Sequence, residues 1–193
     1  LVAQPSGDGV IHEEDIPSWS APFVMATINT KNVHRTNALR EHPYGRDFVY
    51  DERLLAGRGP AGQRRARRLA LNTKLQNAAL GFAPARALLS RYVLPKPGEG
   101  PGPHERETGR YELVFSGETD DGRTLRAVVE GDRDPGYGST SRMLCEAALC
   151  LLQDVDRGMA AGGVWTPGAA MGMALVRRLQ ERAGLRFAID DAA

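Results

Sequence analysis

Residues 111–131 read YELVFSGETDDGRTLRAVVEG and carry the clearest secondary-structure signal in the chain. Apolar residues alternate with polar or smaller ones on both sides of the polar run 119–122, which ends in glycine. A period of two is the period of a β-strand, and a short polar run that ends in glycine is typical of a turn. The pattern therefore predicts an antiparallel hairpin with one face in contact with water.

Two helices and a strand are predicted after the hairpin. Apolar residues at helical spacing predict the first helix, and they are Met143, Leu144, Ala147, Ala148, Leu151 and Leu152. Thr166 as N-cap, Pro167 at the first helical position and Gly184 just past the end bound a second helix over 168–183. A short strand over 185–189 follows. The sequence therefore predicts an α+β fold in which helices cover a mixed or antiparallel sheet, with no internal repeats.

The N-terminal half is expected to begin with an arm or linker over residues 1–21, where glycines and an Ile-Pro pair interrupt a mostly polar stretch. The β-branched and aromatic run 22–29 predicts a short buried strand, and 30–39 a short helix capped by Asn29 or Thr30. Residues 22–193 are expected to form a single α+β domain.

The middle of the chain is predicted to be helical and then irregular. Residues 63–81 read as a helix with Leu69, Leu75, Ala79 and Phe82 turned inward, and Pro84 begins a second helical turn that runs to about residue 92. The Pro- and Gly-rich run 94–103 cannot be a helix or a central strand, so an extended loop is expected there.

The charges exclude one class of protein and indicate a local patch. The chain has 193 residues, with 25 Lys and Arg against 24 Asp and Glu, and so lacks the field of a globally basic nucleic-acid-binding protein. Ten of the basic residues and none of the acidic ones lie between Arg53 and Gly98. This region could bind phosphates or lipid headgroups, but a solvated face, or pairing with the acidic stretch 99–121, is the favoured explanation.

A reduced, cytoplasmic protein is expected, and neither nucleic-acid binding nor membrane association. No stretch approaches the roughly 20 apolar residues that cross a bilayer, and the N-terminus lacks a signal-peptide pattern. Cys145 and Cys150 lie about 140° apart around the predicted helix and cannot bridge each other. The four histidines are far apart in the sequence, so no metal site is expected.

The turn over 134–140 is the first candidate site. Pro135, Gly136 and Gly138 would let the backbone approach a ligand in front of a helix N-terminus, with Tyr137 and Thr140 facing the cleft. The alternative is a tight turn in which Ser139 or Thr140 only caps the helix.

Arg35 and Asn37 form a second candidate, able to hold a carboxylate or an amide, although plain surface exposure explains them equally well. No P-loop and no Gly-x-Ser-x-Gly elbow occurs in the sequence, and no dinucleotide-binding fingerprint is assigned to it. Nucleotide-triphosphatase, hydrolase and self-contained dehydrogenase functions therefore lose support.

Several blocks in order resemble one family. They are Phe23-Val24-Met25-Ala26-Thr27-Ile28-Asn29-Thr30, Arg35-Thr36-Asn37-Ala38-Leu39, Tyr44-Gly45 with Tyr50-Asp51-Glu52, Lys96-Pro97-Gly98-Glu99-Gly100-Pro101, Asp134-Pro135-Gly136-Tyr137-Gly138 with Thr140, and Gly162-Gly163-Val164-Trp165-Thr166-Pro167 followed by Ala170-Met171-Gly172. Together they resemble the C-terminal part of saccharopine dehydrogenase-like oxidoreductases, in the branch of the bacterial trans-acting enoyl reductases. The resemblance spans roughly residues 21–187.

The resemblance implies a C-terminal substrate-side and oligomerisation domain of an NAD(P)-dependent oxidoreductase, which is not catalytic alone. Such proteins carry an N-terminal Rossmann domain that this chain lacks, so no cofactor is expected to bind here, while NAD or NADP is implied for the full-length protein. The implied partners are that Rossmann domain, a second copy in a homodimer, and a small-molecule or acyl substrate. Residues 164–189 are candidates for packing on the nucleotide domain.

Four residues are carried into the site as substrate contacts, namely Arg35, Asn37, Tyr137 and Thr140, and no catalytic residue is assigned. The chain begins with Leu1 instead of Met, which is the expectation for a piece of a longer protein. The alternative function is a non-enzymatic binding or interaction module that uses the basic region 53–96.

Overall fold

The computed structural model describes residues 2–92, 96, 98–156 and 162–190. The chain divides into two compact units, residues 1–99 and residues 100–193, and each is described by itself. In the described residues, two three-stranded antiparallel sheets and six helices form an α+β protein, as the sequence predicts. The single domain over 22–193 stays a prediction.

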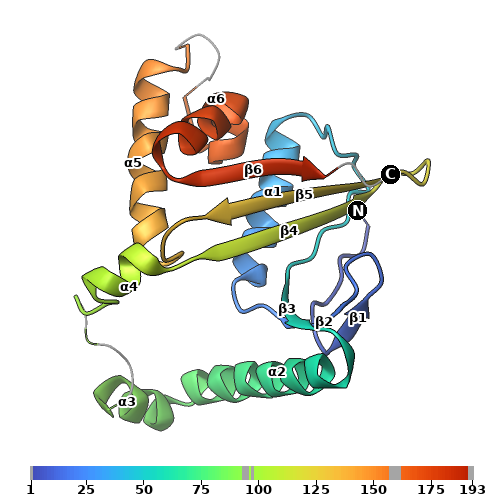
Figure 1. Cartoon of the computed structure of the whole chain (residues 1–193), viewed down its shortest axis with the longest axis vertical. Coiled ribbons are helices and arrows are strands. Elements are labelled where there is room, and N and C mark those ends of the chain that lie inside the picture. The colour runs from blue at the N-terminus through green and yellow to red at the C-terminus, as the bar shows by residue number, and fades with distance from the viewer. Residues whose placement is uncertain (1, 93–95, 97, 157–161, 191–193) are drawn as a thin grey trace. The chain divides into compact units, whose positions relative to one another are not determined.

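The sheet of the second unit contains the predicted hairpin. Strands β4 (Tyr111–Glu118), β5 (Thr124–Gly131) and β6 (Leu185–Asp190) pair antiparallel in that order (Figure 1). Leu113 lies opposite Val129 and Phe115 opposite Ala127, so the alternating residues share one face. The hairpin prediction is confirmed, although Leu113, Phe115 and Leu125 remain 39–49% exposed.

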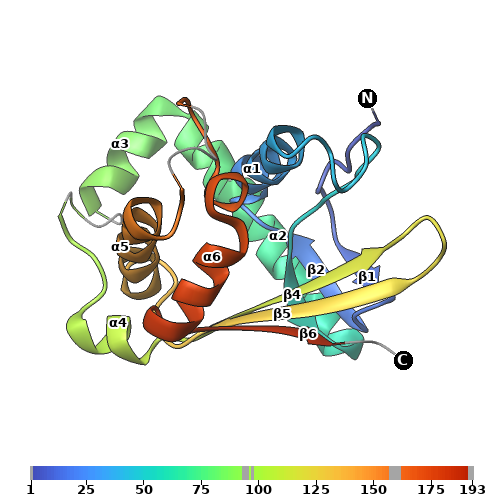
Figure 2. The ribbon, with the colours of Figure 1, turned by 90° about the horizontal axis from the view of Figure 1, so that it is seen from above.

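Two long helices cover one face of this sheet (Figure 2). They are α5 (Gly138–Gln153) and α6 (Pro167–Arg182), and the short helix α4 (Pro103–Thr108) precedes the hairpin. Leu179, Ala183 and Leu185 form the buried cluster, against which Val129, Met143, Leu175 and Phe187 pack. The predicted boundaries of α6 are confirmed, because Thr166 is the N-cap, Pro167 starts the helix, and Gly184 follows with a φ of 75°.

The first unit contains a second small sheet, made of β1 (Ile11–Glu13), β2 (Ser18–Pro22) and β3 (Arg53–Gly57). Most of β1 and β2 lies in residues 1–21, where an arm or linker was expected. Short strands with polar sequences give no alternating apolar signal, so the pattern could not reveal them. The long helix α2 (Gly59–Gly81) packs on this sheet through a cluster of Ala21, Ala56 and Ala66.

The predicted strand over 22–29 is wrong, because helix α1 (Ala26–Leu39) already begins within it. Val24, Met25 and Ile28 are 41–56% exposed and not buried in a sheet. The helix buries a different set of residues at a spacing of three to four, described below. A short β-branched run cannot distinguish a strand from the first turn of a helix by propensity alone.

The helices over 63–81 and 84–92 are confirmed as α2 and α3 (Ala83–Tyr92), but the predicted inward face of α2 is only partly correct. Leu69 packs against the core, whereas Leu75 and Phe82 are 59% and 63% exposed. The buried positions of α2 are Gly62, Ala66 and Ala70. The predicted loop over 94–103 lies partly outside the described residues, and its last residue, Pro103, begins α4.

Candidate functional site

The candidate site of the first unit is built on α1 and the segment 44–52 that follows it. The inner face of α1 carries Ala26, Thr30, Val33 and Asn37, which are spaced by four, three and four residues and lie on one side of the helix. Polar side chains of this face and its margins bond to the segment 44–52. These contacts fix the rotation of α1, so they also decide which residues its outer face presents.

A chain of hydrogen bonds holds the start of α1. Glu52 accepts hydrogen bonds from the Tyr50 hydroxyl at 3.0 Å and from Asn29 Nδ2 at 2.8 Å. Burial, and then the negative charge and hydrogen bond of Glu52, raise the pKa of the Tyr50 phenol well above its ordinary value. The phenol therefore remains a hydrogen-bond donor at all physiological pH values, and the cluster serves as a rigid polar support.

The far end of α1 is held by Asn37, which is buried to 3% exposure. Its Nδ2 donates to the Gly45 carbonyl at 2.8 Å, and its Oδ1 accepts from the Tyr44 backbone N–H at 3.1 Å. Both ends of this amide are used to fix the turn after the helix. Asn37 is therefore a positioning residue, and its predicted role as a direct substrate contact is not supported by this geometry.

Aromatic rings and Gln4 complete the support between these two ends. Phe48 lies against His34, Tyr44 and Tyr50 with ring centroids 5.3–6.0 Å apart. Gln4 Oε1 accepts from the Tyr50 backbone N–H at 3.1 Å and lies 3.1 Å from His34 Nε2. The N-terminal segment is thus part of the support beneath α1.

The outer face of α1 is exposed and combines apolar and basic side chains. Ile28, Lys31 and Arg35 follow one another at helical spacing on the side of α1 opposite Asn37, and Val24 lies two residues before the helix. Val24 and Ile28 are 56% and 54% exposed, and Lys31 and Arg35 are also exposed. An apolar end beside a cationic end can contact a molecule that has a hydrocarbon part and an anionic or carbonyl part. The role of Arg35 as a substrate contact stays a prediction.

The turn over 134–140 in the second unit is a capping structure. Asp134 Oδ2 accepts from the backbone N–H groups of Tyr137 at 2.7 Å and Gly138 at 3.0 Å, and its carbonyl accepts from Ser139 N–H at 2.8 Å. The two bonds to the carboxylate, led by that of Gly138, lower the pKa of the Asp134 carboxyl group. The carboxylate thus occupies the N-terminus of α5, where the sequence analysis places a ligand.

Most residues of this turn that the sequence predicts as ligand contacts instead contact other residues of the second unit. Thr140 Oγ1 donates to the Pro135 carbonyl at 2.7 Å, and a Cβ on Gly138 would collide with the Arg106 carbonyl oxygen. Gly138 therefore permits a close backbone approach within the unit. Tyr137 is 57% exposed with its ring against Gly100, and its hydroxyl has no hydrogen-bond partner in the described part of the chain.

The predicted site residues lie in different units. Arg35 and Asn37 belong to residues 1–99, and Tyr137 and Thr140 to residues 100–193, so neither unit alone brings the four together.

The second unit also has a surface hollow of about 690 Å³ at one end of its sheet. The Glu130–Arg186 ion pair, 2.6 Å long, lies in its lining, and sequence reasoning did not find it.

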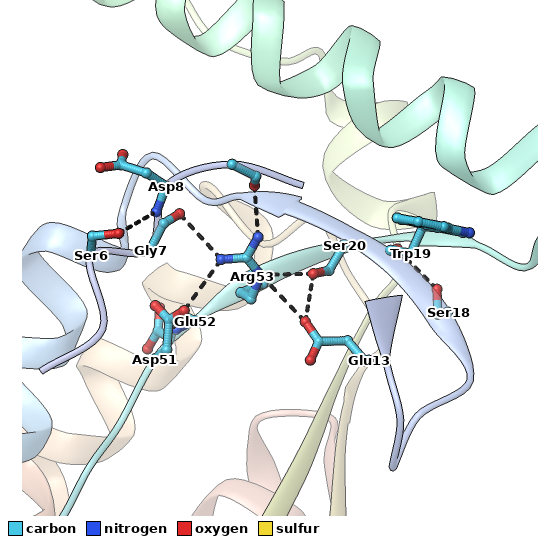
Figure 3. A network of polar contacts seen from close by, with 11 residues as sticks. Ser6, Gly7, Asp8, Glu13, Ser18, Trp19, Ser20, Asp51, Glu52 and Arg53 are labelled. Carbon is cyan, nitrogen blue, oxygen red and sulfur yellow. Dashed lines mark hydrogen bonds and ion pairs between the residues drawn. The ribbon is translucent and has the colours of Figure 1, made fainter. Parts of the chain in front are cut away.

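Arg53 forms a buried network that sequence reasoning counted only as part of a basic run (Figure 3). Its side chain is 10% exposed and donates to Ser20 Oγ at 2.7 Å and to the carbonyls of Gly7 and Gly9 at 3.2 and 2.8 Å. Glu13 and Asp51 lie within 3.3–3.4 Å of the guanidinium. Arg53 is therefore not available to an external partner.

Arg178 has the same role in the second unit, where it joins α6 to α5. Its side chain is 8% exposed, and it donates to Glu146 at 2.6 Å, to Asp154 at 2.7 Å and to Gln153 at 3.1 Å. An arginine among helix residues gives no sequence signal of such a role. In the predicted helix over 168–183, Arg178 follows Leu175 by three residues. The sequence therefore indicates only that these two side chains lie on neighbouring sides of the helix.

Among the described residues, no three His, Cys, Asp or Glu side chains gather where they could hold a metal ion. None of the helices in the described ranges has the length and hydropathy of a membrane span. Cys145 and Cys150 are both free thiols, as the predicted helical spacing requires.

Comparison with known proteins identifies relatives of greater length. A Mycobacterium tuberculosis protein that carries the provisional name trans-acting enoyl reductase is 39% identical over 167 residues, which are 83% of this chain and 39% of that protein. Trans-acting enoyl reductases of Mycobacterium ulcerans and Mycobacterium bovis are 37% and 38% identical over 84% and 83% of this chain, and 39% of each relative is covered.

No protein-family model matches the chain, and no solved structure matches it. The chain spans about two fifths of the length of the curated relatives. Over more than four fifths of its own length, the chain is therefore similar to one part of proteins named trans-acting enoyl reductases.

Proposed function

We propose that the chain is the substrate-side and oligomerisation part of an enoyl-reductase-like oxidoreductase and that the outer face of α1 contacts the acyl substrate. The observation that carries the proposal is the 37–39% identity to trans-acting enoyl reductases over 83–84% of the chain. The blocks from Phe23 to Thr30 and from Arg35 to Leu39, which carry the family resemblance, make up most of α1.

Reduction of an α,β-unsaturated acyl group places negative charge on the carbonyl oxygen during the reaction. A cation or hydrogen-bond donor aimed at that oxygen favours the transition state. Arg35 or Lys31 would supply the donor, while Val24 and Ile28 would contact the acyl chain. The support beneath α1, made by Asn37, Glu52 and Tyr50, would keep this face in a fixed orientation.

A nicotinamide would supply the hydride, but the described residues do not fit a dinucleotide. The turn from Gly57 to Gly62 between β3 and α2 has the spacing Gly-x-Gly-x-x-Gly, but β3 pairs antiparallel with β2 and does not belong to the parallel βαβ unit that binds a dinucleotide. The Gly136–Gly138 turn is filled by Asp134 and by the Arg106 backbone. We therefore assign no hydride step to this chain. NAD or NADP would bind a separate Rossmann domain, and residues 164–189 would pack there in addition to their contacts in the second unit.

The proposal is tested by titrating the chain with a long-chain enoyl thioester and, separately, with NADPH in a calorimeter. We expect the thioester to bind and NADPH not to bind. Arg35→Gln should weaken thioester binding roughly 10- to 100-fold, because a hydrogen bond to a charged group contributes about 1.5–3 kcal/mol.

The matched control is Arg40→Gln, which removes the same charge at the C-cap of α1 on the side away from Ile28. Equal weakening by both variants would indicate a general charge effect and would remove the outer face from the site. Binding of NADPH, or no thioester binding by a chain with an unchanged circular dichroism spectrum, would overturn the proposal. Replacing Tyr137 with Phe in a full-length protein, with turnover and affinity unchanged, would exclude Tyr137.

A further inference from the structure

The first unit has an exposed helical face that the proposed function does not use. We call it the α2–α3 face. Its apolar residues are Leu71, Leu75, Phe82, Leu88 and Tyr92, which are 56–70% exposed. Leu71 and Leu75 lie one turn apart on α2, and Leu88 and Tyr92 lie one turn apart on α3, so each helix exposes a pair of neighbouring apolar side chains.

The helical geometry places apolar and basic residues together. Gly62, Ala66 and Ala70 are the buried side of α2, which faces the sheet of the first unit. At about 100° per residue, Leu71 and Leu75 lie on the opposite side of the helix. Arg64, Arg67, Arg68 and Lys74 surround them within one to two turns, and all four are exposed.

The charge of this region has one sign. Between Arg53 and Gly98 the chain has ten basic residues and no acidic residue, and only Arg53 among them is held in the buried network described above. The formal net charge of +1 hides this segregation, because the 24 acidic residues all lie elsewhere. The expectation of no membrane association depends on the lack of a spanning segment and of a signal-peptide pattern, and neither addresses a local face.

We propose that the α2–α3 face binds the surface of an anionic lipid bilayer. Helices that lie in a membrane interface combine Lys and Arg with exposed Leu, Phe and aromatic residues, as here. The arginines would contact lipid phosphates, and the apolar residues would enter the boundary between headgroups and acyl chains. An acidic protein is the competing partner, but a bilayer supplies negative charge and apolar depth along both helices without a complementary shape. This proposal is independent of the acyl-binding role of α1.

The test is sedimentation of the whole chain with vesicles of phosphatidylcholine alone or mixed with phosphatidylglycerol. We expect sedimentation with the anionic vesicles only, weakening as salt rises to physiological ionic strength, where the screening length is about 8 Å. The triple variant of Arg64, Arg67 and Arg68 to Gln should weaken binding at least tenfold, since each basic residue near an anionic surface contributes roughly fivefold. Leu71→Ser with Leu75→Ser should also weaken it at least tenfold.

Two controls match these variants. Arg123, Arg177 and Arg182, all exposed and all in the second unit, are changed to Gln for charge. Leu144 and Leu152, which are 70% and 77% exposed on α5, are changed to Ser for apolarity. The proposal is overturned if the controls weaken binding as much as the test variants, or if the folded chain does not sediment with anionic vesicles at low salt. It is also overturned if the Leu variants abolish self-association in the absence of lipid, because the face would then join two copies.

Discussion

Arg53→Met should be among the most destabilising single changes in the first unit. The guanidinium is the shared partner of Ser20, two backbone carbonyls and two carboxylates (Figure 3). Methionine has a similar length but cannot donate a hydrogen bond. Its substitution leaves Glu13 and Asp51 without a cation, at side-chain exposures of 27% and 22%, and Ser20, which is fully buried, without its donor.

The expected loss follows from the burial of these groups. Removing one partner of a buried ion pair costs about 3–5 kcal/mol, because a charge is left without compensation. The two carboxylates keep about a quarter of their exposure, so we expect a loss of about 2–4 kcal/mol in the free energy of unfolding. In a unit of this size, 1 kcal/mol corresponds to a shift of roughly 4–8 °C in Tm, so Tm should fall by about 10 °C or more.

Urea unfolding followed by tryptophan fluorescence provides the assay. Trp19 lies in β2 next to Ser20 and reports on the first unit, and a Trp165→Phe background leaves it as the single tryptophan. The matched control is Arg58→Met, which removes an exposed arginine at the N-cap of α2 and should change the free energy of unfolding by less than about 0.5 kcal/mol. If Arg53→Met costs no more than Arg58→Met, the network does not stabilise the unit and the reasoning is refuted.

Two further predictions concern the second unit. Gly131→Ala should lower the free energy of unfolding of this unit by about 1–3 kcal/mol, because the new Cβ would overlap the Tyr111 ring. The control Gly117→Ala should have little effect, because no atom lies within 4 Å of its new Cβ. Urea midpoints measured by circular dichroism compare the two variants, and equal midpoints would show that the ring moves aside freely. The lowered pKa of Asp134 in the folded state means that its ionised form stabilises the fold above the ordinary Asp pKa, and that this contribution is lost as pH falls through the folded-state pKa. Urea midpoints should therefore fall between about pH 5 and pH 2, and Asp134→Asn should remove part of that dependence; an identical pH profile in the variant would contradict the capping role.

The parts of the fold that the sequence predicted are those encoded by adjacent residues. The hairpin over 111–131 carries its alternation, its turn and its terminal glycine in one stretch, and the structure pairs Leu113 with Val129 accordingly. Helix α6 likewise carries its N-cap, its first-turn proline and its terminating glycine in sequence order. No distant residue is needed to specify these elements.

The parts that the sequence did not predict depend on partners far along the chain. Arg53 looks like any member of a basic run, and its inward orientation comes from Gly7, Gly9 and Ser20, which lie 33–46 residues earlier. The β-branched run near Ile28 is compatible with a strand, and the bonds of Asn29 and Asn37 to residues 44–52, which hold α1, are not visible in that run. Local propensity cannot contain information of this kind.

The turn over 134–140 shows how a capping structure and an anion site produce the same sequence pattern. Both need small residues before a helix and free N–H groups at its start, and they differ only in what supplies the negative charge. Here Asp134 supplies it, four residues before Gly138, and the same carboxylate accepts both N–H bonds. An aspartate placed just before such a glycine turn is therefore evidence for the cap. The proposed substrate contacts consequently move to the outer face of α1, where the exposed apolar Val24 and Ile28 accompany the exposed Lys31 and Arg35.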